Sequence, residues 1–155
     1  MDPGRRGPRG GGHGRARRVP VRVLRGGAGR AARGAAADAG AYGLCVKPPH
    51  YVHSWADAPT SAIVRRFEVV AKAVPLPMMV YNSPNRTNVR ITPDVLESIR
   101  GVAQVEALKD TDHDTGHQLE NVLRFHDRMA VLVSGPAFMP AMLMGARGTI
   151  GTGMD

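Results

Sequence analysis

Short apolar segments alternate with amphipathic segments along most of this chain, and this alternation limits its fold more than any other feature. From Ala41 onwards, each apolar run is followed by a stretch with apolar residues at helical spacing. Because the links between them are short, the strands must run parallel and be joined by right-handed helical crossovers. The sequence therefore predicts an α/β domain built on a parallel sheet. The predicted strands are residues 42–46, 78–81, 102–109, 129–133 and 148–152, and the predicted helices are residues 60–74, 92–100, 115–126 and 136–144.

The first 34 residues differ sharply from the rest of the chain. They contain ten Arg, ten Gly and one acidic residue, Asp2, for a net charge of +9, whereas residues 35–155 carry −1. We expect residues 1–34 to be a disordered or degraded leader, with a strand at 19–24 and a helix at 29–39 as an altered strand-helix unit. An alternative interpretation is an Arg/Gly-rich arm that binds nucleic acid through phosphate contacts, attached to a non-catalytic domain.

Two of the predicted strands end in side chains capable of chemistry. One apolar run ends at Tyr81 and the next at Lys109, one of only three lysines among 155 residues. The C-terminal ends of parallel strands meet at one edge of a sheet, so the two side chains can converge there. A lysine in such a poorly solvated place can act as an amine nucleophile toward a carbonyl. On spacing alone, an ion pair of Lys109 with Asp110 or Glu106 is an equal alternative.

The motif Tyr81-Asn82-x-Pro84-x-Arg86-Thr87, followed by a strand that carries Lys109, resembles the dihydrodipicolinate synthase / N-acetylneuraminate lyase family of class I Schiff-base aldolases. The resemblance runs from about Ala35 to the last residue, which makes 35–155 the expected aldolase domain. It implies a (β/α)8 TIM barrel with parallel strands. A complete barrel needs about 200 to 250 residues. We therefore expect an incomplete barrel that lacks the first strand-helix units and the C-terminal helices.

The resemblance also implies roles for these side chains. Lys109 would form an imine with pyruvate or another 2-oxo acid, which could then react with an aldehyde. Tyr81 would move protons, and Arg86 would bind a substrate carboxylate. The structural alternatives are a strand-end tyrosine bonded to backbone and a solvated loop arginine. The function implied is a pyruvate-dependent carbon-carbon lyase or synthase.

Further residues are assigned by the resemblance alone. Tyr51 matches a catalytic tyrosine that reaches across a dimer interface, although Val52 replaces the usual asparagine after it. Pro136 stands where the family usually has an acid. The remaining substrate-binding residues implied are Thr87, Ser134, Gly135 and Ile150. The family's Gly-Thr-Thr-Gly-Glu turn occurs nowhere in these 155 residues, so we expect weak or no activity from this chain alone.

Other features favour structural roles. We expect Cys45 to be a buried thiol, and the Met-rich segment 138–144 to be helix core. His113 and His117 lie near several aspartates, but we expect neither a metal nor any other cofactor. We expect a cytoplasmic homo-oligomer with no membrane association, and not a nucleic-acid-binding protein.

Overall fold

Five parallel strands form one sheet whose spatial order is the order of the sequence. The computed structural model describes residues 22–23, 38–50 and 58–151. The strands are β1 (Arg22–Val23), β2 (Leu44–Val46), β3 (Met78–Asn82), β4 (Val105–Asp110) and β5 (Ala130–Val133). The helices are α2 (Thr60–Ala73), α3 (Pro84–Thr87), α4 (Pro93–Arg100), α5 (Thr115–Phe125) and α6 (Phe138–Leu143).

The helix boundaries follow from local sequence signals. Thr92 caps α4 by accepting a hydrogen bond from the Val95 amide at 3.4 Å, and Pro93 occupies the first helical position. Asp114 caps α5 in the same way through the His117 amide at 3.1 Å. These side chains satisfy amides that would otherwise lack a partner at the helix starts.

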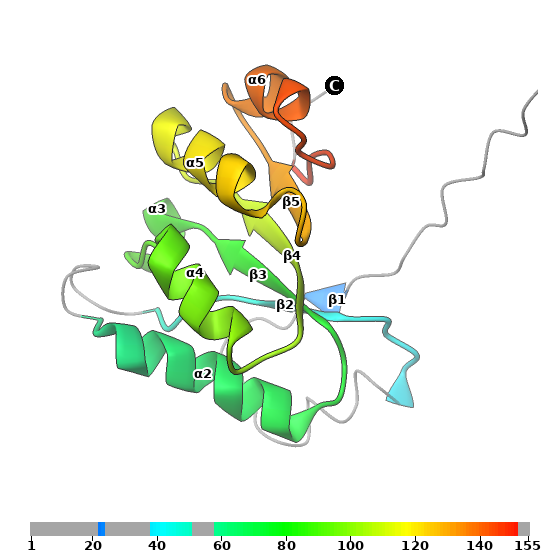
Figure 1. Cartoon of the computed structure of the whole chain (residues 1–155). Helices are drawn as coiled ribbons and strands as arrows, with labels where there is room; N and C mark the ends of the chain where they lie inside the picture. The colour runs from blue at the N-terminus through cyan, green and yellow to red at the C-terminus, as the bar shows by residue number, and fades with distance from the viewer. Residues whose placement is uncertain (1–21, 24–37, 51–57, 152–155) are drawn as a thin grey trace, which may run out of the picture.

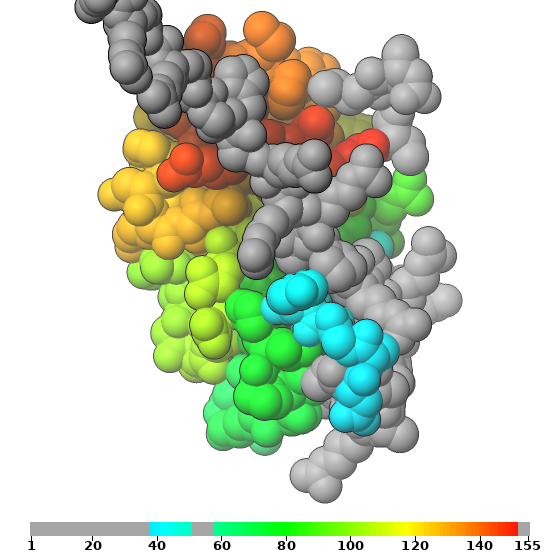
Figure 2. All heavy atoms as spheres, turned by 90° about the vertical axis from the view of Figure 1, so that its right-hand side faces the viewer, coloured from blue at the N-terminus to red at the C-terminus, as the bar shows by residue number. Residues whose placement is uncertain are grey.

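The main helices lie together on one face of the sheet, where the hydrophobic core forms (Figure 1). Alternation along each strand sends every second side chain into this core. In β3, Met78 and Val80 belong to the core and Met79 does not. In β4, Leu108 points into the core, where Phe67 of α2 and Phe125 of α5 are fully buried. The intervening residues of the strands therefore lie on the opposite face. Figure 2, turned by 90°, shows the cyan segment 38–50 beside the green segment that leads into β3, where the Leu44 amide donates to the Pro77 carbonyl at 2.9 Å.

The structure confirms most predicted elements and corrects three predictions. Instead of a strand at 148–152, the described part of that segment makes one parallel bridge, between Leu132 and Gly148. The predicted helix 136–144 is shortened to the six residues of α6. The expected core role fails for Met139 and Met142, which are 65% and 39% exposed, whereas Met144, just after α6, packs partly buried against the core. The short helix has only one buried residue, Ala141, which explains why its other apolar side chains face outward.

Some predictions fall outside the described residues or are met only in part. Of the predicted strand 19–24, residues 22–23 form β1, which pairs in parallel with β2. Most of the predicted helix 29–39 and most of the 1–34 leader lie outside the described residues, so the proposed domain boundary stays a prediction. Among the helices that the structure describes, none has the length and apolar character needed to cross a membrane.

Candidate functional site

A row of three side chains crosses the sheet at the C-terminal ends of β2, β3 and β4. Tyr81 and Lys109 are direct neighbours in the β3–β4 register. Lys47 directly follows β2, whose last residue Val46 pairs with Val80, so Lys47 continues the register opposite Tyr81. All three lie on the face away from the core helices, because side chains alternate along each strand. Tyr81 therefore sits between two lysines.

An irregularity in β4 sets this register. Met78 pairs with Val105, but the next residue, Met79, pairs with Ala107, so Glu106 has no counterpart on β3. Without that extra residue, Lys109 would lie opposite Asn82 and point to the other face of the sheet. The bulge at Glu106 thus places the Lys109 amine beside Tyr81.

The two amines lie close to the Tyr81 ring. Lys109 Nζ is 4.2 Å and Lys47 Nζ 4.7 Å from the ring centroid, within the range of a cation–π contact. Burial opposes ionisation of the phenol and raises its pKa, but hydrogen bonds with Thr111 and Ser83 and the two lysine charges outweigh it. The net pKa of Tyr81 is therefore lowered. A tyrosine with a lowered pKa is better suited to exchanging protons with a substrate.

The alternative role for Lys109, an ion pair with a neighbouring acid, is wrong. Asp110 is fully buried on the core side of β4, one residue out of phase with Lys109. Glu106 is exposed and accepts a hydrogen bond from Gln104 at 3.2 Å. Within the part of the chain that the structure describes, no carboxylate lies within 4.0 Å of the Lys109 amine.

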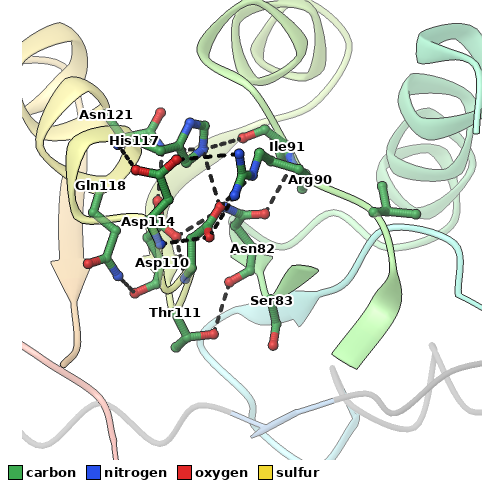
Figure 3. A network of polar contacts seen from close by, with 12 residues as sticks. Asn82, Ser83, Arg90, Ile91, Asp110, Thr111, Asp114, His117, Gln118 and Asn121 are labelled. Carbon is green, nitrogen blue, oxygen red and sulfur yellow. Dashed lines mark hydrogen bonds and ion pairs between the residues drawn. The ribbon is translucent and has the colours of Figure 1, made fainter. Parts of the chain in front are cut away.

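A buried polar network joins β3 and β4 directly behind the row (Figure 3). Asn82 and Asp110 follow Tyr81 and Lys109 in the chain and are themselves register partners. Asn82 Nδ2 donates to Asp110 Oδ1 at 3.0 Å, and Asn121 Nδ2 donates to Asp110 Oδ2 at 2.8 Å. Burial raises the pKa of Asp110, although the Asp112 amide, Asn121, His117 and Asn82 all act against that rise. The network fixes the two strand ends that carry Tyr81 and Lys109.

A second set of charges surrounds this network at the start of α5. The Arg90 guanidinium contacts both carboxylate oxygens of Asp112, at 2.7 and 3.1 Å, and the Asp112 side chain is 1% exposed. The Asp112 carboxylate also lies 4.0 Å from His117 Nε2. Its burial requires such a cation, because a buried carboxylate without a partner is costly. His117 and the aspartates therefore belong to a structural network. Among the described residues, no three His, Cys, Asp or Glu side chains are arranged as metal ligands.

The other residues expected at the site lie at several places. Arg86 is exposed in the last turn of α3. Thr87 is buried, and its hydroxyl donates to the Ser83 carbonyl at 3.0 Å and accepts from the Val89 amide at 3.2 Å, so it stabilises the turn after β3. Tyr51 lies outside the described residues. Their functional assignments stay predictions.

The residues after β5 approach the same edge of the sheet. Gly135 has a φ of +83°, a backbone conformation that favours glycine, and it directly follows the half-buried Ser134. A Cβ at Gly151 would lie 3.6 Å from the Ser134 Cβ, so residues 148–151 pass beside this strand end. Ile150 is 40% exposed. Their predicted contact with substrate stays a prediction.

Sequence reasoning missed Lys47 and the pairing of Asn82 with Asp110. The signal for Lys47 was present, because it follows an apolar strand in the same way as Tyr81 and Lys109. The Asn82–Asp110 contact had no comparable signal, since it depends on the register of β3 against β4. The prediction that Cys45 is buried is confirmed, and burial raises its pKa even though Lys109 and Lys47 act to lower it.

Comparison with known proteins identifies the family. Residues 27–155 match the Dihydrodipicolinate synthetase family. The 4-hydroxy-tetrahydrodipicolinate synthase of Sorangium cellulosum is 35% identical over 119 residues, which are 75% of this chain and 38% of that protein. The enzyme of the same name from Syntrophus aciditrophicus is 29% identical over 116 residues, covering 73% of this chain and 38% of that protein.

A solved structure gives the same result for the fold. A prophage protein of E. coli K12 from the dihydrodipicolinic acid synthase family, solved in complex with pyruvate, matches with a TM-score of 0.69 and 27% identity. The match covers 78% of this chain and 41% of that one. The parallel sheet thus corresponds to part of a TIM barrel, which confirms the predicted fold class. The chain spans about 38% of the length of the curated relatives it matches, and it belongs to the dihydrodipicolinate synthetase family.

Proposed function

We propose that the edge of the sheet around Lys109 is part of the active site of a pyruvate-dependent carbon-carbon lyase or synthase of the dihydrodipicolinate synthase type. One observation carries this proposal: an amine without a carboxylate partner among the described residues lies 4.2 Å from the ring of a tyrosine whose pKa is lowered. The family membership and the relative solved with pyruvate support the choice of substrate.

The chemistry assigns a separate step to each group. The neutral amine of Lys109 attacks the ketone carbon of the 2-oxo acid, and loss of water from the resulting carbinolamine gives an imine. The protonated imine withdraws electrons, so a methyl proton can leave and the enamine carbon can bond to an aldehyde. Tyr81 is the proton carrier for water loss, since the Lys109 amine lies 4.2 Å from the centroid of its ring. The network behind the strands keeps the two groups in register.

Arg86 and the residues after β5 complete the proposal as substrate contacts. Tyr51 would supply a second phenol from across a subunit interface. This role therefore also predicts a homo-oligomer. Because the chain covers 38% of its relatives' length, we expect the 155 residues alone to form the imine slowly and to complete few turnovers. Loss of any member of a catalytic group that acts as a unit costs most of the rate.

Borohydride trapping tests the proposal directly. The full chain is incubated with pyruvate and sodium borohydride, and peptides are then analysed by mass spectrometry. We expect Lys109 to gain the mass of pyruvic acid less one oxygen atom, as the hydride reduces the imine to a secondary amine. Lys109→Arg should abolish the adduct, whereas Lys72→Gln should not affect it, because Lys72 is paired with Glu68 on the surface of α2 at 2.6 Å. An adduct spread over several lysines, or none, would refute the assignment.

A further inference from the structure

Two lysine amines share one aromatic ring, and among the described residues neither has an anionic partner. The third lysine, Lys72, pairs with Glu68 at 2.6 Å. We propose that Lys47 binds the carboxylate of the 2-oxo acid while Lys109 reacts with its ketone carbon. This inference rests on the proposed function and names the anion-binding residue of the same site.

The spacing of the row allows one small substrate to contact both amines. Lys47 Nζ and Lys109 Nζ lie 4.7 and 4.2 Å from the Tyr81 ring centroid, so the two nitrogens are at most 8.9 Å apart, the sum of those distances. In a 2-oxo acid the carboxylate carbon is bonded directly to the ketone carbon. The flexible four-carbon stems of the two lysines allow one amine to reach each group. A substrate held in this way would lie against the Tyr81 ring.

The electrostatics also favour an anion at this place. Two ammonium groups near each other in a half-buried site repel, and a carboxylate between them would reduce that repulsion. Cys45 lies on the same face and is close enough for both lysines to influence it. It does not supply the negative charge, since burial raises the pKa of its thiol. Among the described residues no acidic group contacts the two amines, and a bound carboxylate would supply the negative charge.

Arg86, which the resemblance assigns to a carboxylate, is a competing candidate. It is exposed on α3, four residues beyond the end of β3, whereas Lys47 adjoins the strand end and contacts the same ring as Lys109. If Lys47 binds the carboxylate, Lys47→Gln should lose reactivity toward pyruvate but not toward an uncharged ketone. If Arg86 binds it, Arg86→Gln should show that loss instead, so one experiment separates the two assignments.

The experiment compares two ketones of nearly equal shape. Pyruvate carries a carboxylate, and pyruvamide replaces it with a neutral amide but keeps the ketone. In both cases the Lys109 nitrogen bonds to the ketone carbon, water leaves, and borohydride supplies the hydride that reduces the imine. We expect Lys47→Gln to lower the trapping efficiency with pyruvate by about tenfold or more, because the variant loses a hydrogen bond to a charged group. Trapping with pyruvamide should change by less than about twofold, because that probe has no charge to lose.

Three further variants, Lys47→Arg, Lys72→Gln and Arg86→Gln, complete the design. Lys47→Arg keeps the charge and should retain most of the pyruvate adduct, and Lys72→Gln should resemble the wild type with both probes. Circular dichroism checks that each variant is folded. Equal loss with both probes, no loss in Lys47→Gln, or a pyruvate-specific loss in Arg86→Gln alone would overturn the inference.

A separate measurement keeps the inference distinct from the proposed function. Oxamate has the carboxylate and shape of pyruvate but an amide carbonyl that forms no imine, so its binding depends only on recognition. If the wild type forms no adduct with either ketone, the proposed function fails, and oxamate binding by calorimetry then decides the role of Lys47. Binding at least about tenfold weaker in Lys47→Gln supports the inference. Equal binding, or none by the wild type, overturns it.

Discussion

Asn82→Asp tests the contact that holds together the two strand ends carrying Tyr81 and Lys109. The substitution keeps the side-chain shape but replaces the amide nitrogen, which faces Asp110 Oδ1 at 3.0 Å, with an oxygen. Two carboxylates then meet where both residues are 0% exposed. At an effective dielectric constant of about 20, unit charges separated by 3.0 Å repel by about 5.5 kcal/mol. The lost hydrogen bond to a charged acceptor adds about 1.5 to 3 kcal/mol.

The pair can avoid this repulsion only by holding a proton, so the effect depends on pH. One of the two carboxyl groups in the folded variant will have a raised pKa. The free energy of unfolding is then highest below the ordinary carboxyl pKa of about 4, and it falls as the pH rises through the raised pKa of the folded state. Since domains of this size are stable by about 5 to 15 kcal/mol, Asn82→Asp should be largely unfolded at neutral pH and partly recovered in acid.

Urea denaturation followed by circular dichroism, at about pH 4 and about pH 7.5, measures the effect. The wild type should show a weaker trend in the same direction, because burial already raises the pKa of Asp110. Asn85→Asp is the matched control, since it makes the same chemical change at an exposed position of α3. Equal urea midpoints for Asn82→Asp and the wild type at neutral pH would refute the buried contact.

Three further predictions address the site and the core. Tyr81→Phe should slow trapping of pyruvate on Lys109 by at least about tenfold. The pH dependence of the trapping rate should also lose the ionisation of the phenol, which lies below pH 10.0 in the wild type because the Tyr81 pKa is lowered. An unchanged rate would exclude a proton-transfer role. Arg90→Met should lower the free energy of unfolding by about 3 kcal/mol, since it leaves the buried Asp112 carboxylate without its cation. Arg65→Met, which breaks an exposed pair, should cost less than about 1 kcal/mol. Phe67→Ala should cost about 3 to 5 kcal/mol by the same urea measurement, because Phe67 is 0% exposed in the core.

Much of the fold could be predicted from local signals. The long amphipathic helix α2, the Thr92-Pro93 start of α4 and the apolar strands β3 and β5 all have clear patterns in the sequence. The predictions that failed concern segments near the C-terminus. The methionines of α6 have the composition of a core helix, but exposure is decided by which neighbours pack against a helix. A six-residue helix buries too few side chains to settle this from its own sequence.

The sequence by itself determined the parallel α/β class and predicted Tyr81 and Lys109 at neighbouring strand ends as candidate site residues, because periodicity and the position of a residue in a strand are local properties. Only the tertiary structure decided that these two side chains share a face, since that depends on the extra residue Glu106 in β4. It also revealed Lys47 beside the same ring and the buried Asn82–Asp110 contact behind it. Register is a relation between strands 28 residues apart in the chain, and a shift by one residue reverses every side chain without altering any local pattern.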